Sequence, residues 1–208
     1  MIIGHDSIII MRELPWYEVQ SSDFSMLIDD VNCNFVPEQP GIYQWRMNIA
    51  ISPSVASSSE QIIRRIDQIT KRPSGIIKDA TINSTIKTSI TIGGHGLTEK
   101  KSTNLFDFMK NKKVRIYTAR FINSLKLAAP ILYIGKADNL KKRIKQHLNN
   151  ESDFSTNLIN NYHLSFDDLV LYYCPVVDSD AEKAKDYLEL LELISQRIIN
   201  PFAVERMG

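Results

Sequence analysis

The sequence predicts an α+β protein, because strand patterns and helix patterns both occur along it. Short apolar or alternating runs bounded by glycine, proline or asparagine are typical of strands, and apolar residues recurring every three or four positions are typical of helices. With 208 residues, 43% of them hydrophobic, the chain can bury one core, or one core plus a small accessory lobe.

The first segment, residues 1–36, is expected to form a helical preface packed on the core, since it carries Trp16, Phe24 and Leu27. Residues 1–45 hold one basic side chain against seven acidic ones, a net charge of −6. This acidity argues against a nucleic-acid contact in that segment.

Two short segments each place one tyrosine on a strand-like run. The first is Pro40-Gly41-Ile42-Tyr43 and the second is Leu132-Tyr133-Ile134-Gly135-Lys136-Ala137. A glycine at the end of a strand allows a tight turn. The second segment therefore predicts a strand that turns directly into a helix.

Between these strands, residues 47–129 are predicted to hold three further elements. Ser58 to Lys71 has helical spacing, Thr81 to Ile92 alternates as one strand or a strand pair, and Val114 to Phe121 is a further strand candidate. Residues 93–96 are glycine-rich and predict a hairpin turn.

The helix after Gly135 is predicted to begin at Asp138, whose carboxylate can cap its first turn. Arg143 and His147 are four residues apart, so their side chains should share one face of the helix. That face borders the buried row, which consists of Leu140, Ile144 and Leu148.

The last part of the chain predicts a buried strand, Leu169 to Cys174, and a helix, Lys183 to Ile199, that ends before Pro201. Glu192 lies near the margin of the apolar stripe of this helix and Glu189 lies nearly opposite the stripe. The predicted stripe consists of Tyr187, Leu190, Leu191, Ile194 and Ile198.

The ordered set of motifs resembles the GIY-YIG nuclease superfamily, whose members are metal-dependent phosphodiesterases acting mainly on DNA. Pro-Gly-Ile-Tyr is followed by Tyr-Ile-Gly-Lys-Ala, and an arginine and a histidine follow the second glycine at eight and twelve positions. The resemblance implies a core of residues 37–46 and 130–208, with a small, mainly antiparallel sheet flanked by helices. Residues 47–129 are then a large insertion between the first two core strands.

The resemblance also implies roles for the motif residues. Tyr43 is expected to be a general base or water-orienting phenol, and Tyr133 to orient water or phosphate. Arg143 is expected to clamp the scissile phosphate, for which its planar, permanently charged fork is suited. Lys136 and His147 are candidates for a cation or a second proton acceptor beside Tyr43, and Lys136 also for a phosphate contact.

The catalytic metal is expected to be Mg²⁺, or Mn²⁺, held by Glu192 with Glu189 as the alternative. Glu192 is preferred because it stands nine residues before Pro201, as in relatives. Relatives carry an asparagine shortly after that proline, whereas this chain has Val204 there and Asn200 before the proline.

The insertion is the candidate DNA-binding subdomain, with a merely solvated basic lobe as the alternative. Residues 46–130 hold 15 basic against 5 acidic side chains, a net charge of +10, while the whole chain has +1. Such a concentration of positive charge favours phosphate binding. The candidate DNA contacts in it are Lys100, Lys101, Lys112, Lys113, Arg115 and Arg120.

The expected function is a type II-like restriction or phage-defence endonuclease that cuts double-stranded DNA as a homodimer, since two strands require two sites or two visits. The alternatives are a repair or structure-specific nuclease and a non-cutting nucleic-acid-binding regulatory module. The chain has no eighteen-residue apolar run and no basic stretch before its first isoleucines, so we expect a cytoplasmic protein.

Overall fold

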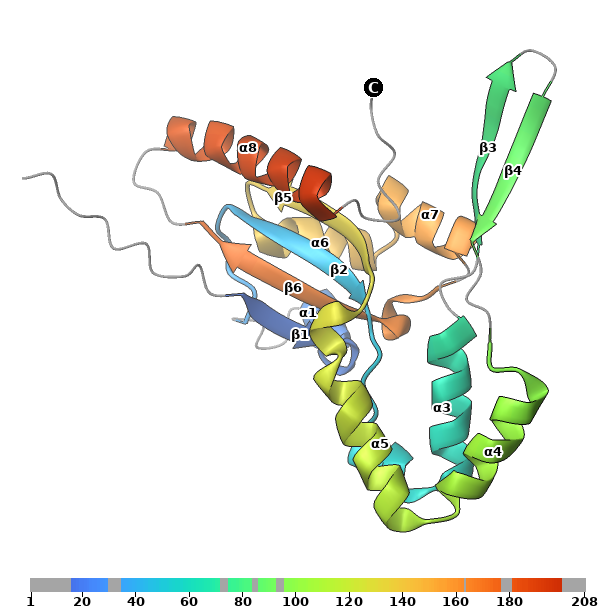
Figure 1. Cartoon of the computed structure of the whole chain (residues 1–208). Coiled ribbons are helices and arrows are strands. Elements are labelled where there is room, and N and C mark those ends of the chain that lie inside the picture. The colour runs from blue at the N-terminus through green and yellow to red at the C-terminus, as the bar shows by residue number, and fades with distance from the viewer. Residues whose placement is uncertain are drawn as a thin grey trace, which may run out of the picture.

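The computed structural model describes residues 16–29, 35–71, 75–83, 86–92, 96–162, 164–176 and 181–199. Its core is a four-stranded antiparallel sheet in the order β1-β6-β2-β5, and β3 and β4 form a separate antiparallel pair (Figure 1). The strands are β1 (Tyr17–Gln20), β2 (Gly41–Met47), β3 (Gly75–Asn83), β4 (Ile86–Ile92), β5 (Ile131–Ala137) and β6 (Leu169–Pro175). The predicted α+β class with an antiparallel core sheet is confirmed.

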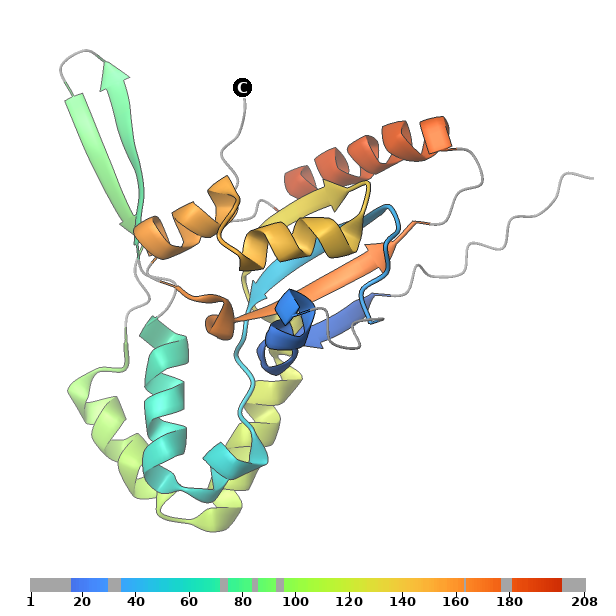
Figure 2. The same ribbon diagram turned by 180° about the vertical axis from the view of Figure 1, so that it is seen from behind.

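Helices cover both faces of the core sheet, with α8 on one face and α6 on the other (Figures 1 and 2). None of the helices within the described ranges is long and apolar enough to cross a membrane. The α-helices are α1 (Phe24–Asp29), α2 (Pro53–Ser57), α3 (Ser59–Lys71), α4 (Glu99–Met109), α5 (Lys112–Ser124), α6 (Leu140–Leu148), α7 (Asp153–Tyr162) and α8 (Ala181–Ile199). Short 3-10 helices are η1 (Ser21–Asp23), η2 (Lys126–Ala128) and η3 (Phe166–Asp168).

Alternation along β2 divides its side chains between the two faces of the sheet. Tyr43 and Trp45 are fully buried in the main core beside Ile144 of α6. Ile42 instead packs with Leu188 of α8 in a smaller cluster on the opposite face. Strand β2 lies inside the sheet, between β5 and β6, and therefore carries Tyr43 into the main core, where it is fully buried.

The described part of the N-terminal segment contains a strand as well as a helix. Strand β1 pairs with β6 at one edge of the sheet, and Phe24 and Leu27 of α1 are buried in the main core. Residues 1–15 and 30–34 lie outside the described residues.

The insertion forms a helical lobe with its own small core (Figure 1). Helix α3 and the β3–β4 pair agree with the sequence prediction, although β3 begins earlier, at Gly75. The glycine-rich residues 93–95 lie outside the described residues. The second core consists of Ile51, Ala56, Ile62, Ile66, Met109 and Ala119.

The strand predicted at Val114 to Phe121 is wrong, because this segment lies in α5. The Asn111 side chain accepts from the Lys113 N–H at 2.9 Å and starts the helix. Val114, Ala119 and Ile122 then pack on the second core at helical spacing. Packing against α2 and α3 therefore overrides the strand preference of the local β-branched and aromatic residues.

Two details of the other predicted helices also need correction. Helix α6 is capped by Asn139, whose side chain accepts from the Lys142 N–H at 2.9 Å, and not by Asp138. On α8, Leu188 and Leu191 pack on the sheet, whereas the predicted stripe faces mainly outward. Its exposed members are Tyr187, Leu190, Ile194 and Ile198.

Candidate active site

Strand β5 forms the edge of the core sheet, so side chains from both faces can meet beside it. Tyr43 pairs with Gly135, and Trp45 pairs with Tyr133. The next pair is Arg46 with Ile131, so Leu132 is an extra residue in β5. Bulges of this kind re-aim neighbouring side chains and are frequent beside active sites. Here Leu132 and Tyr133 both contact the main core.

Four of the predicted site residues converge on one point next to β5. The Tyr43 hydroxyl lies 2.7 Å from Nε2 of His147, and Nε of Arg143 donates to the same phenol oxygen at 3.4 Å. The ring centroids of Tyr43 and Tyr133 are 6.0 Å apart. Strands β2 and β5 and helix α6 thus bring two phenols, a guanidinium and an imidazole together.

Burial governs the protonation of this cluster. It raises the pKa of Tyr43 well above its ordinary value, Tyr133 raises it further, and Arg143 only partly opposes these effects. Burial and the charge of Arg143 lower the pKa of His147 to about 3. At neutral pH the cluster therefore contains a neutral phenol and a neutral imidazole, and its cation is Arg143.

Arg143 is held in place on the surface of α6 by a neighbour. Its Nη1 donates to Oε1 of Gln146 at 3.1 Å, in addition to the Nε contact with Tyr43. A guanidinium carries five N–H groups, more than these two contacts use. Arg143 is partly exposed, so it can offer the remaining donors to a phosphate.

Glu192 reaches the same strand from α8. Nε2 of Gln196 donates to Oε1 of Glu192 at 3.2 Å and to the Ile134 carbonyl at 3.3 Å, so Gln196 ties this carboxylate to β5. Burial raises the pKa of Glu192, although the charges of Lys136 and Arg143 act in the opposite direction. The influence of Arg143 places Glu192 within electrostatic reach of the phenol cluster.

Glu189 has a different environment, because it is 68% exposed at its side chain and pairs with Nζ of Lys136 at 3.0 Å. Within the described ranges, no three His, Cys, Asp or Glu side chains gather into a metal site. A single carboxylate still fits Mg²⁺, which keeps several waters and shares its remaining positions with substrate phosphate oxygens. The half-buried Glu192 is therefore the better candidate ligand. Asn200 and Val204 lie outside the described residues.

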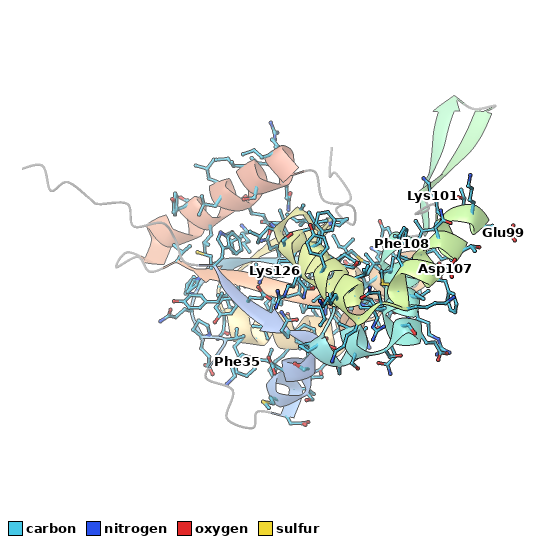
Figure 3. The ribbon with its side chains drawn as sticks, turned by 60° about the horizontal axis from the view of Figure 1, so that its bottom comes forward. Phe35, Glu99, Lys101, Asp107, Phe108 and Lys126 are labelled. Atoms are coloured by element: carbon cyan, nitrogen blue, oxygen red, sulfur yellow. The ribbon has the colours of Figure 1, made fainter. Side chains whose placement is uncertain are left out.

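The predicted DNA contacts fall into two groups. Lys100 and Lys101 are exposed in the first turn of α4, where Figure 3 shows Lys101 on the side of the molecule away from α8. Lys112 and Lys113 are exposed in the first turn of α5, and Arg120 is exposed farther along it.

Arg115 must be removed from the predicted DNA contacts. Its guanidinium donates to the carbonyls of Ala56, Ser57, Met109 and Lys110, at distances between 2.8 and 3.2 Å. It therefore binds the ends of α2 and α4 to α5 and has a structural role.

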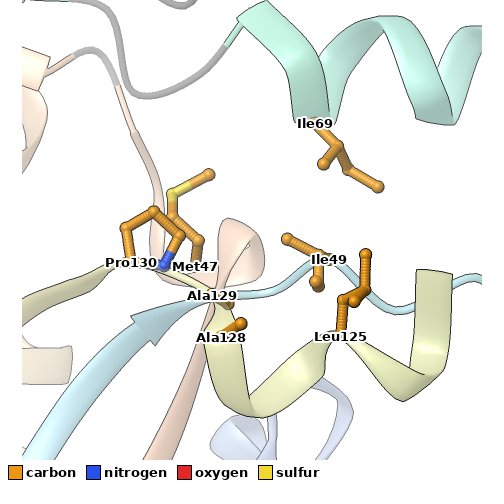
Figure 4. A pocket seen from close by; sticks show the side chains of 7 residues that line it. All are labelled: Met47, Ile49, Ile69, Leu125, Ala128, Ala129 and Pro130. Atoms are coloured by element: carbon orange, nitrogen blue, oxygen red, sulfur yellow. The ribbon is translucent and has the colours of Figure 1, made fainter.

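An apolar cavity of about 240 Å³ lies where the helical lobe joins the core sheet (Figure 4). It is lined by Met47, Ile49, Ile69, Leu125, Ala128, Ala129 and Pro130. These side chains carry no group that could transfer a proton or bind Mg²⁺, so the cavity is not the candidate active site.

Sequence reasoning missed the residues that orient the site, namely Gln146, Ser152, Ser155 and Gln196. The two serines lie next to His147, since Oγ of Ser152 is 2.6 Å from its Nδ1 and 2.9 Å from Oγ of Ser155. The only sequence signal of the two glutamines is spacing, since Gln146 follows Arg143 by three positions and Gln196 follows Glu192 by four. Polar residues at such spacings are common on exposed helix faces and do not by themselves indicate a site.

An α+β core that gathers phenols, a guanidinium and a half-buried carboxylate at one sheet edge has the kinds of group that phosphodiester-cleaving proteins use. Residues 113–192 match the family model of the GIY-YIG catalytic domain. This match, to the described catalytic domain, supports the resemblance of the chain to the GIY-YIG superfamily of nucleases. No curated protein and no solved structure matches the chain.

The match begins within α5 and includes Tyr133, Arg143, His147 and Glu192, but not β2. Strand β2 lies outside the matched residues but belongs to the same sheet, because it pairs with β5 and places Tyr43 beside the matched residues. The insertion separates the two tyrosine strands in sequence but leaves them adjacent in space.

Proposed function

We propose that this protein is a divalent-metal-dependent endonuclease that cuts double-stranded DNA, of the type II-like restriction or phage-defence kind. The observation that carries the proposal is the convergence of Tyr43, Arg143 and His147 at hydrogen-bonding distances beside β5, with Glu192 in electrostatic reach.

Hydrolysis of a phosphodiester needs a positioned water, neutralisation of charge on the phosphoryl oxygens and help for the leaving alkoxide. Arg143 donates to the phosphoryl oxygens. Tyr43 orients the attacking water and takes up its proton, while Tyr133, beside it, confines the water and the phosphate. Lys136, on the same strand, contacts a neighbouring phosphate.

Glu192 would hold the metal, with Mg²⁺ or Mn²⁺ as the candidate ion. When bound, such an ion neutralises charge on the phosphoryl group and lowers the pKa of a coordinated water. Gln196 keeps Glu192 turned toward β5 and away from bulk solvent.

The helical lobe is the proposed DNA-binding subdomain. Its chain leaves from the end of β2 and returns directly into β5, the strand that carries Tyr133. The outward face of α5 combines the cations Lys113 and Arg120 with Tyr117, which is 73% exposed. Cations neutralise phosphates and exposed aromatic rings stack on bases, so this face has the composition of a nucleic-acid contact.

A homodimer follows from the single set of catalytic groups in each chain, because a duplex has two strands to cut. The outward stripe of α8 supports it, since Leu190 is 51% and Ile198 is 77% exposed. Apolar faces of this kind mark interaction surfaces. In sedimentation, the wild type should be a dimer and Ile194→Glu should be a monomer.

Two other functions compete with this proposal. A repair or structure-specific nuclease would use the same site on damaged or branched DNA. A non-cutting regulatory module is less well supported, because the described residues keep both phenols, the guanidinium and the imidazole together, and the charge of Arg143 acts on the Glu192 carboxylate.

The decisive experiment is digestion of plasmid DNA with Mg²⁺, which should give discrete bands that disappear with a chelator. A random smear would contradict sequence-specific cleavage, and cutting only of branched DNA would indicate the repair function. Arg143→Ala should abolish cleavage while duplex binding is kept. Lys142→Ala is the matched control, since Lys142 has the same charge and is exposed on the same helix.

A further inference from the structure

A pair of serines lies behind His147, on the side away from Tyr43. Nδ1 of His147 is 2.6 Å from Oγ of Ser152, which is 2.9 Å from Oγ of Ser155. Ser155 is fully buried at the start of α7, and its hydroxyl donates to the Ser152 carbonyl at 2.7 Å. The imidazole is thus held between a phenol and a hydroxyl.

Counting protons decides how this network is connected. A carbonyl oxygen has no proton, so the 2.7 Å contact uses the only proton of the Ser155 hydroxyl. The 2.9 Å contact between the two hydroxyls must then use the proton of Ser152. Ser152 has no proton left for His147, so the proton of the 2.6 Å contact belongs to Nδ1.

The opposite tautomer, with the proton on Nε2, leaves one oxygen–oxygen contact without a proton. If Ser152 donated to Nδ1, one of the two contacts of Ser155 would be a close approach of two oxygens with no proton between them. In the first arrangement both hydroxyl oxygens also accept from the backbone: the Ser155 N–H donates to Oγ of Ser152 at 3.2 Å and the Ser152 N–H donates to Oγ of Ser155 at 3.3 Å. Every donor and acceptor of the serine pair is then used.

We propose that Ser152 and Ser155 are positioning residues that hold His147 in the tautomer with its proton on Nδ1, so that Nε2 accepts the proton of Tyr43. The catalytic role of Nε2 as a proton acceptor rests on the proposed nuclease function, whereas the assignment of the tautomer does not. A neutral imidazole is expected here, since burial lowers the pKa of His147 to about 3.

The tautomer gives Tyr43 a route for its own proton. As the phenol oxygen takes a proton from the attacking water, the original phenol proton moves to Nε2. The phenol stays neutral, the imidazole becomes an imidazolium, and the Nδ1 proton stays bonded to Ser152. Tyr43 can therefore act without first ionising, which its raised pKa opposes. The imidazolium is only transient, because the low pKa of His147 favours return of the proton once the attack is complete.

The tautomer can be read directly from two-bond ¹H–¹⁵N spectra of the ¹⁵N-labelled full chain, with His147→Gln assigning the signal. We expect a protonated Nδ1 and an unprotonated Nε2 in the wild type. Ser155→Ala frees the proton of Ser152 for donation to Nδ1, so the signal should shift toward the Nε2-protonated form. Nε2 protonation in the wild type, or an unchanged tautomer in Ser155→Ala, would overturn the proposal.

Thr156→Val is the matched control, because the Thr156 hydroxyl donates to the same Ser152 carbonyl but contacts neither serine hydroxyl. It should leave the tautomer unchanged. Ser152→Thr should also preserve it, whereas Ser152→Ala removes both the acceptor for Nδ1 and the N-cap of α7. Ser155→Ala is therefore the sharper variant.

Cleavage kinetics give a second readout. Loss of a correctly placed proton acceptor should lower kcat of Ser155→Ala roughly 100-fold, with duplex affinity unchanged. A full kcat together with a shifted tautomer would overturn the assigned role of Nε2. Absence of cleavage in the wild type would refute the nuclease function and leave the tautomer result standing.

Discussion

The phenol oxygen of Tyr43 lies 2.7 Å from Nε2 of His147, although the two residues are 104 positions apart in the chain. The contact passes beside Gly135, which has no side chain to obstruct it. A Cβ atom at position 135 would lie 2.6 Å from the Tyr43 hydroxyl and 2.8 Å from a ring carbon of Tyr133. The glycine of the second motif is therefore needed for the approach of the two phenols.

Gly135→Ala should consequently disrupt the cluster. The added methyl group must displace Tyr43 or Tyr133, and both rings are packed in the main core. We expect cleavage to fall at least about 100-fold, as displacement of a reacting group by about an ångström can cost. Cleavage of plasmid DNA by the variant should be compared with cleavage of the same plasmid by the wild type.

The control for this change is Gly96→Ala. The nearest atoms to a Cβ there belong to the flexible side chain of Lys71, at 3.0 Å, which can move aside. Equal losses in the two variants would contradict a specific role for Gly135.

The two acids of α8 should respond differently to neutralisation. Glu192→Gln removes the proposed metal ligand, which is worth several kcal/mol, so cleavage should drop by more than about 100-fold. Metal titration followed by calorimetry, with and without duplex DNA, should show weaker binding.

Glu189→Gln is the matched comparison, because it makes the same chemical change one helical turn away. It breaks an exposed ion pair with Lys136, and such pairs contribute less than about 1 kcal/mol. Cleavage should stay near the wild-type level. The reverse pattern would assign the metal to Glu189.

Much of the core was predictable from sequence because its signals are local. Gly135 does not end its strand as expected, because it pairs with Tyr43 inside β5, which continues to Ala137. The strand around Tyr133, the spacing of Arg143 and His147 and the run from Leu169 each follow from the periodicity of a single element. The structure confirms these elements, and the tyrosine strands pair as the family resemblance implies.

The parts that could not be predicted depend on packing between distant segments. Val114 to Phe121 has strand-like residues, but a second core formed with α2 and α3 makes it a helix. Arg115 has the chemistry of a phosphate contact, but four carbonyls from other elements take its donors. The apolar stripe of α8 gives no indication that the helix turns Leu188 and Gln196 inward.

Burial of His147 should make the fold sensitive to acid. Its pKa is about 3 in the folded state and about 6.5 in an unfolded chain, so between these values only the unfolded state binds the proton. The free energy of unfolding therefore falls as pH decreases below 6.5, by up to about 1.4 kcal/mol per pH unit from this group.

His147→Gln removes that contribution. The variant should be less stable than the wild type at pH 8, and the difference should shrink by about 2 kcal/mol at pH 5. Urea unfolding of both proteins at the two pH values measures it. A difference that does not change with pH would show that His147 is protonated equally in both states.

Positive charge on the outward face of α5 should make the affinity for DNA depend on salt concentration. If Lys113 neutralises one phosphate, Lys113→Gln should reduce the slope of log K against log salt concentration by about 0.9. Lys71→Gln is the control, since Lys71 lies in the same lobe but pairs with Asp67 at 2.6 Å. Its slope should match that of the wild type.

Arg115→Ala removes a positive charge from the same helix, but it should affect the stability of the fold and not DNA binding. Because Arg115 joins three helices through backbone carbonyls, its loss should lower the free energy of unfolding by roughly 2 kcal/mol. At temperatures where the variant is still folded, the salt slope should be unchanged, since its donors already have partners. A reduced slope in Arg115→Ala with normal stability would place this guanidinium on DNA and show that its carbonyl contacts are exchanged for phosphates on binding.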